Sequence, residues 1–101
     1  MAIVAASGDV DMLTAPQLRE AIDAALGQQP EGLIVDLSAV DFLGSAGMQV
    51  LMEAHNQTGD SVRFAVVADG PATSRPLKIT GIADLITLYA SLDAALQNFA
   101  A

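Results

Sequence analysis

The chain has 101 residues, 52% of them hydrophobic, and a formal net charge of −8 from twelve acidic and four basic residues. This length is typical of one domain, and such a high hydrophobic fraction excludes a disordered chain. The absence of cysteine excludes disulfides and thiolate-bound metal ions. The acidic charge argues against nucleic acid as a partner.

A membrane segment is not expected either. No apolar run approaches the ~18 residues of a membrane-spanning helix. The first six residues, 1–6, lack the basic flank and the length of a signal peptide. We therefore expect a cytoplasmic protein without a membrane partner.

The N-terminal part predicts a strand and then a helix. Residues 3–6 form a short apolar run typical of a strand, and residues 9–11 follow in a predicted loop. Thr14 is the predicted N-cap of a helix, with Gln17 completing a capping box, and Gly27 is expected to end this helix.

The centre of the chain is the most informative stretch. Residues 33–35, Leu-Ile-Val, predict a strand buried on both faces, and we expect Asp36 and Ser38 to end it. Residues 44–47, Gly-Ser-Ala-Gly, form a predicted turn of small side chains. The apolar spacing after this turn predicts an amphipathic helix that closes at residues 58–59.

The C-terminal part continues the alternation. We expect a strand over residues 62–67, a short helix over 73–80 that ends at Gly81, a strand over 86–89 near an edge of the sheet, and a last helix capped by Ser91. Strands that alternate with helices predict an α/β domain with at least four strands, some of them parallel.

Ser45 stands where a strand has ended and a helix begins. The first N–H groups of a helix are unpaired and carry partial positive charge, so a hydroxyl there can cap the helix and a phosphate there is stabilised. The simplest interpretation is a plain N-cap serine, and a functional serine is the alternative.

The central stretch resembles the sulfate-transporter and anti-sigma-factor-antagonist domain, the STAS family. That family has a hydrophobic strand, Asp-Leu-Ser, a hydrophobic residue before an Asp-Ser-x-Gly turn, and then Leu or Met opening a helix. Residues 36–38, 42–43 and 45–48 match these features, but Gly44 stands where the family usually has Asp. Residues 8–11 and 80–86 also resemble family passages.

The resemblance implies a single STAS domain over residues 1–101. It implies a mixed sheet of four or five strands with helices packed mainly on one face. Family members usually have another strand some ten residues before the one at Ile3, and the sequence leaves no room for it. Because an uncovered apolar edge invites strand pairing, we expect self-association or limited stability.

The resemblance also implies a function. It points to an anti-sigma-factor antagonist, not an enzyme, that binds an anti-sigma factor with serine-kinase activity and so frees a sigma factor. Phosphorylation of Ser45 would end the binding, and a serine phosphatase would restore it. No cofactor or metal is implied. The implied partner-binding residues are Asp9, Asp11, Asp36, Gly44, Ser45, Ala46, Gly47 and Met48.

Other site chemistries find less support in the sequence. A serine hydrolase needs a base near its nucleophile, but the only histidine, His55, lies about 15 Å from Ser45 along the predicted helix. We expect His55 at the margin of the core. The carboxylates of Asp9, Asp11, Asp36 and Asp41 could converge on a divalent cation, although carboxylates that cap turns are the more ordinary interpretation.

Two alternatives to the phosphorylated antagonist stay open. One is an unphosphorylated scaffold of the same fold, in which Gly44 reports the loss of kinase recognition. The other is a sensor of a small ligand or nucleotide that uses the helix N-terminus at Ser45.

Overall fold

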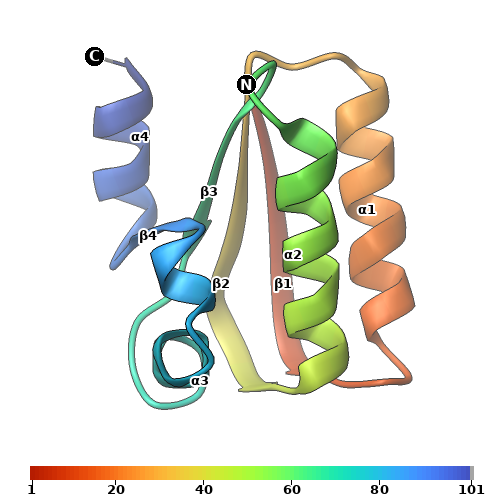
Figure 1. Cartoon of the computed structure of the whole chain (residues 1–101), viewed down its shortest axis with the longest axis vertical. Helices are drawn as coiled ribbons and strands as arrows, with labels where there is room; N and C mark the ends of the chain where they lie inside the picture. Colours follow the sequence, from red (N-terminus) through yellow and green to blue (C-terminus); the bar gives the residue numbers. More distant parts are fainter. Residues whose placement is uncertain (101) are drawn as a thin grey trace.

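The computed structural model describes residues 1–100 and shows an α/β domain built on one four-stranded sheet (Figure 1). The strand order is β1-β2-β3-β4, and β1 and β4 form the two edges. The elements in chain order are β1 (Ala2–Val10), α1 (Ala15–Gly27), β2 (Gly32–Leu43), α2 (Ser45–Thr58), β3 (Arg63–Val67), α3 (Ser74–Ile79), the 3₁₀ helix η1 (Ile82–Asp84), β4 (Thr87–Tyr89) and α4 (Leu92–Ala100).

All three strand pairings in the described sheet are parallel. The α/β class is therefore confirmed, but the mixed sheet expected from the family is not what residues 1–100 form. The physical reason is the connectivity: a helix separates each strand from the next, and such crossovers join parallel neighbours. The edge position predicted for the strand over residues 86–89 is confirmed, since β4 lies at an edge.

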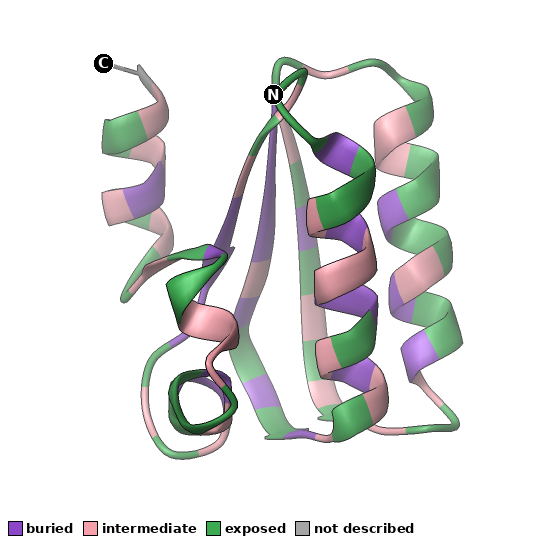
Figure 2. Ribbon diagram, viewed as in Figure 1, coloured by how far each residue is buried: buried purple, intermediate pink, exposed green. Residues whose placement is uncertain are grey.

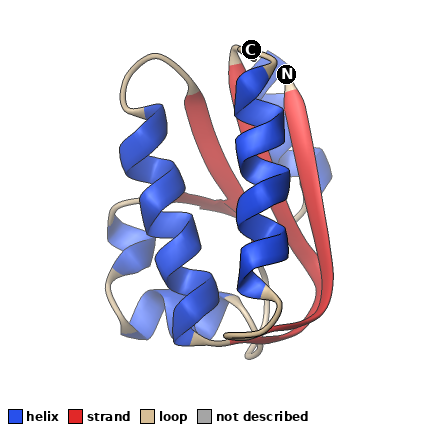
Figure 3. Ribbon diagram, turned by 90° about the vertical axis from the view of Figure 1, so that its right-hand side faces the viewer, coloured by secondary structure: helices blue, strands red, loops and turns tan. Residues whose placement is uncertain are grey.

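The helices cover the sheet unequally. Side chains alternate between the two faces of a strand, so Leu33 and Val35 point into the larger core beneath α1 and α2, while Ile34 points toward α4. Figure 3 shows α1 and α2 side by side over their face of the sheet. The expected packing of helices mainly on one face is confirmed, with α4 alone packed against Ile34 and Val67 on the other.

The centre of the sheet is the most buried part of the molecule (Figure 2). Leu33, Ile34 and Val35 are each 0% exposed, which confirms the strand predicted to be buried on both faces. Burying an aliphatic side chain of this size stabilises a fold by about 1.5–3 kcal/mol. These three residues fix β2 in the middle, and the rest of the domain is arranged on both sides of it.

Two strands are longer than the sequence predicted. β1 continues through the expected loop to Val10, and β2 continues past Asp36 to Leu43. The two extensions pair with each other, with register shifts between Ala5 and Ser7 and between Gly8 and Asp9. The polar residues that suggested strand ends therefore mark bulges, where one strand carries an extra residue and bends.

The predicted helix ends agree better with the structure. α1 ends at Gly27, α2 ends at Thr58 before Gly59, and Gly81 follows α3 with a left-handed φ of 83° that favours glycine. Ser91 caps α4 as predicted, because its hydroxyl accepts a hydrogen bond from the Ala94 N–H at 3.1 Å. None of the helices within residues 1–100 is both long enough and apolar enough to cross a bilayer.

Candidate functional site

Ser45 is the first residue of α2, and its side chain is exposed. The N-cap is Gly44, whose backbone is extended (φ −84°, ψ 177°), and no side-chain hydrogen bond caps the helix. The Gly44 N–H donates to the Val10 carbonyl at 2.9 Å, which ties the turn to the end of β1. The interpretation of Ser45 as a plain N-cap is therefore wrong, and its hydroxyl is directed to solvent at the positive end of the helix.

Gly47 holds the start of α2 close to the sheet. It is buried, and a Cβ at this position would lie 2.6 Å from Val10 Cγ1 and 2.7 Å from Leu43 Cδ1. A side chain there would force Val10, Leu43 or the start of the helix to shift. The neighbours of Gly47, Ala46 and Met48, are half-buried against the core. Gly47 therefore determines where Ser45 lies relative to the ends of β1 and β2.

The loop after β1 lies beside this turn, because Asp9 pairs with Phe42 and Val10 with Leu43 in the parallel register. Asp11 Oδ1 accepts hydrogen bonds from the N–H groups of Leu13 (2.9 Å) and Thr14 (3.1 Å). These bonds, that of Leu13 first, lower the pKa of Asp11 below 3.8. The turn-capping interpretation is confirmed for Asp11.

Thr14 does not form the predicted capping box. Its hydroxyl donates to the Asp9 carbonyl at 2.7 Å and accepts from the Asp11 N–H at 2.9 Å, and no side-chain hydrogen bond caps α1. The hydroxyl is instead used by backbone groups of Asp9 and Asp11, which precede the helix. Thr14 therefore ties the start of α1 to the end of β1 at Asp9 and to Asp11 in the loop.

Asp36 lies apart from the other predicted partner-binding residues. It pairs with Ala5 and Val67 in the middle of the sheet, and its carboxylate accepts bonds from the Ser38 N–H (3.0 Å) and hydroxyl (2.7 Å). Asp36 and Leu43 pair with Ala5 and Val10, five residue steps apart on β1, so about 17 Å of strand separate them. The structure thus brings together Asp9, Asp11 and residues 44–48, but not Asp36.

The acidic residues do not converge on a cation. Within residues 1–100 there is no group of three or more His, Asp or Glu side chains arranged to hold a metal ion. The considered site of Asp9, Asp11, Asp36 and Asp41 is thus not assembled. Asp11 and Asp36 instead accept hydrogen bonds from backbone N–H groups two or three residues further along the chain.

A group of exposed apolar side chains lies at the end of the molecule that carries the Ser45 turn, and sequence reasoning missed it. We call it the apolar rim. Four of the seven large hydrophobic side chains that are exposed in the described chain belong to it, where scattered exposure would be unremarkable. The rim consists of Met12 (79% exposed), Leu13 (82%), Phe42 (53%) and Ile79 (73%).

Three elements supply the apolar rim. Met12 and Leu13 lie in the loop after β1, and Phe42 lies at the end of β2. Ile79 ends α3, and the next residue, Thr80, places its hydroxyl 3.9 Å from the sulfur of Met48 in the first turn of α2. The sequence signal for the rim was the pair Met12-Leu13. These two large apolar residues stand between Asp11 and Thr14, outside the predicted strand and helix.

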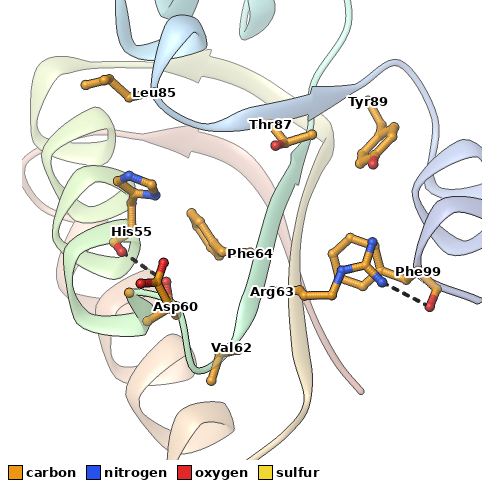
Figure 4. A pocket seen from close by; sticks show the side chains of 11 residues that line it. His55, Asp60, Val62, Arg63, Phe64, Leu85, Thr87, Tyr89 and Phe99 are labelled. Atoms are coloured by element: carbon orange, nitrogen blue, oxygen red, sulfur yellow. Dashed lines mark hydrogen bonds between the residues drawn. The ribbon is translucent and has the colours of Figure 1, made fainter.

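A hollow of about 300 Å³ lies at the other end of α2 from Ser45 (Figure 4). Its lining includes His55 and Asp60 on one side and Arg63 and Phe99 on the other. The Arg63 guanidinium lies 4.4 Å from the centre of the Phe99 ring and donates to the Phe99 carbonyl at 3.3 Å, so it joins β3 to α4. His55 is half-buried at the core margin, as predicted, and it lies ten residue steps along the helix from Ser45.

Comparison with known proteins agrees with this architecture. The STAS domain model matches residues 1–95, and the chain belongs to the STAS family. The anti-sigma-F factor antagonist RsfB of Mycobacterium tuberculosis is 40% identical over 98 residues, which are 97% of this chain and 80% of that protein.

Two solved structures extend the comparison. A crystal structure of an anti-sigma factor antagonist from Mycobacterium paratuberculosis superimposes with a TM-score of 0.91 at 46% identity, covering 95% of this chain and 82% of that one. The anti-sigma factor antagonist SpoIIAA in its unphosphorylated form has a TM-score of 0.64 at 14% identity, covering 97% and 86%, and shares the fold.

Proposed function

We propose that this chain is an anti-sigma factor antagonist. It binds an anti-sigma factor that is also a serine kinase, and this binding releases a sigma factor. Phosphorylation of Ser45 ends the binding, and a serine phosphatase restores it. The names of the relatives at 40% and 46% identity support the first part of the proposal.

The exposed position of Ser45, at the same end of the domain as the apolar rim, is the observation that carries the proposal. A free hydroxyl at the first residue of a helix is accessible to a kinase. Exposed apolar side chains gathered at one end of a small domain are typical of a protein-binding surface. In this proposal one partner covers both, so that modification of Ser45 changes the interface directly.

The partner-binding face then consists of the Ser45 turn, the loop after β1 and the apolar rim. Asp9 and Asp11 belong to it through the pairing of β1 with β2. Gly47 contributes by holding the helix start close to the strands, without presenting a side chain of its own. We assign Asp36 a different role, that of bonding Ser38 within the bulge of β2.

Phosphorylation acts by charge and size. A phosphate adds about −1.5 to −2 charges at neutral pH and three acceptor oxygens. Within the free domain the helix N-terminus stabilises this anion by roughly 0.3–1 kcal/mol, so the fold tolerates it. At a closed interface the same group must lose its water or push the partner away, which costs several kcal/mol.

An unphosphorylated scaffold is the second candidate, and Gly44 is the observation that favours it. The φ of −84° at Gly44 is open to any residue, so the backbone does not require glycine here. The absence of the family's Asp is then a loss of one carboxylate beside Ser45. In this second function the same partner-binding face is used, and Ser45 is not modified.

Affinity capture from the native cell tests the proposal. The baits are the wild-type chain, Ser45→Asp and Ser45→Ala, and the bound proteins are identified by mass spectrometry. We expect wild type and Ser45→Ala to retain an anti-sigma factor of the kinase type, and Ser45→Asp to retain less of it. Capture of no anti-sigma factor by wild type would contradict the proposed function. Equal capture by all three baits would favour the unphosphorylated scaffold.

A further inference from the structure

The exposed face of α3 carries two positive charges and one apolar side chain. Arg75, Lys78 and Ile79 are exposed, whereas Ser74 and Leu77 are buried. The spacing i, i+3, i+4 places the three exposed residues on one side of the helix. We call this set, Arg75, Lys78 and Ile79, the basic face of α3.

The basic face adjoins the Ser45 turn. The Thr80 hydroxyl, directly after α3, lies 3.9 Å from the Met48 sulfur, and Met48 is one helical turn from Ser45 on α2. Figure 1 shows α3 at the same end of the molecule as the start of α2. Ile79 is also a member of the apolar rim, so the basic face and the proposed interface share a residue.

The charges of the basic face are not neutralised by ion pairs within the described part of the chain. Of the four basic residues, Arg19 forms ion pairs with Asp23 and Glu53. Arg63 donates hydrogen bonds to carbonyls at the end of α4. Among the described residues, Arg75 and Lys78 form no ion pair, although the chain carries twelve acidic residues.

We infer that the basic face of α3 contacts acidic side chains of the anti-sigma factor and orients it over Ser45. This inference rests on the proposed function. A chain with a net charge of −8 repels an acidic surface nearly everywhere, so an acidic patch of the partner is attracted only where local positive charge is left unpaired. Beside Ser45, that place is α3.

The same arrangement explains how phosphorylation acts beyond the serine itself. The side chains of Arg75 and Lys78 together carry two positive charges, and a phosphate carries about −1.5 to −2. In this inference a phosphate on Ser45, one helical turn from Met48, opposes the positive charge that attracts the acidic patch. The interface loses its electrostatic attraction together with its steric fit.

Binding kinetics with the purified anti-sigma factor captured by the wild-type bait, free of nucleotide, test the inference. The variant is Arg75→Glu combined with Lys78→Glu. We expect association to slow by about tenfold or more at low ionic strength, and the difference to shrink at high ionic strength. Lys78→Arg keeps the charge and should bind like wild type.

A matched control separates local charge from net charge. Because each reversal lowers the net charge by two, each single reversal, Arg75→Glu or Lys78→Glu, is compared with Gln28→Glu combined with Gln97→Glu, two exposed positions outside the basic face. We expect this control to bind like wild type. Circular dichroism of every variant confirms that a loss of binding is not a loss of fold.

A double-mutant cycle gives the sharpest outcome. If phosphorylation acts partly by cancelling the basic face, Ser45→Asp must weaken binding less in the charge-reversed background than in wild type. Equal binding by the charge-reversed variant and wild type would overturn this inference but not the proposed function. A loss of binding by the charge-reversed variant that is seen only with ATP-loaded anti-sigma factor would do the same. Failure of wild type to bind would contradict the proposed function and this inference with it.

Discussion

Substitution of Gly47 by alanine tests whether the close approach of α2 to the strand ends positions Ser45. The added Cβ would lie 2.6 Å from Val10 Cγ1 and 2.7 Å from Leu43 Cδ1. Both neighbours are buried, so neither methyl group can swing away freely. To reach an ordinary contact of 3.4 Å, the first turn of α2 must move outward by about 0.8 Å.

Two terms of opposite sign decide the stability of this variant. Overpacking a close-packed core costs typically about 1–3 kcal/mol, whereas replacing glycine by alanine within a helix gains about 0.8–1 kcal/mol. We therefore expect Gly47→Ala to be less stable by up to about 2 kcal/mol. Each kcal/mol lowers the Tm of a domain of this size by roughly 4–8 °C.

Gly27→Ala is the matched control. Gly27 is the last residue of α1, and a Cβ there meets no atom within 4 Å. This variant receives the helix gain without the steric cost, so we expect it to be as stable as wild type or up to about 1 kcal/mol more stable. The difference between the two variants isolates the steric term, which we expect to be about 1–3 kcal/mol.

Thermal and urea unfolding followed by circular dichroism measure both variants. We expect Gly47→Ala also to bind the anti-sigma factor more weakly, because Ser45 moves with the helix start, and Gly27→Ala to bind normally. If Gly47→Ala were stabilised as much as Gly27→Ala, the close approach of α2 to Val10 and Leu43 would not constrain the site, and the reasoning would be refuted.

Three further predictions concern the surroundings of Ser45 and the edge of the sheet. Gly44→Asp should speed phosphorylation of Ser45 with little effect on folding, since only the exposed Phe42 ring, 3.1 Å from the new Cβ, must shift. An unchanged rate in a kinase assay would mean that the missing carboxylate has no role. The lowered pKa of Asp11 means that its ionised form stabilises the fold above pH 3.8 and that this stabilisation disappears as the pH falls through the folded-state pKa. Asp11→Asn should therefore melt below wild type at neutral pH and alongside it in acid, and a difference that persisted in acid would argue against this origin. The outer edge of β1 is unpaired in the described sheet and uncharged from Ala2 to Gly8. Sedimentation equilibrium should therefore detect concentration-dependent self-association, and Ala5→Lys should abolish it. A monomer at every concentration would contradict this expectation.

The sequence predicted the features of the fold that depend on neighbours along the chain. The buried strand at residues 33–35, the cap at Ser91 and the left-handed Gly81 each follow from a local pattern, and the structure contains all three. The family resemblance was also carried by contiguous residues. Local patterns are reliable here because the α/β alternation leaves each element little choice of partner.

The sequence failed where two segments compete or pair. β1 and β2 extend to Val10 and Leu43 because each satisfies the backbone of the other, which neither stretch reveals alone. Thr14 bonds within the loop after β1, so no capping box forms. At the start of α2 the N-cap is Gly44, one residue earlier than Ser45.

The candidate site was predicted only in part, for the same reason. Ser45 and its turn were found from one contiguous motif. The apolar rim brings together side chains from the loop after β1, the end of β2 and the end of α3, so it exists only in the folded domain. Asp36 is close to Ser45 in sequence but lies about 17 Å before the end of β2, because the strand does not stop where its polar residues suggested.

Titration calorimetry of three forms of the chain against the anti-sigma factor tests the central claim most directly. The forms are wild type, the chain phosphorylated at Ser45 and Ser45→Ala, each checked for fold by circular dichroism. We expect wild type and Ser45→Ala to bind with similar affinity, and the phosphorylated chain to bind at least about 100-fold more weakly, a difference of about 2.8 kcal/mol. Equal affinities for all three forms, or a loss of binding accompanied by unfolding, would contradict the account.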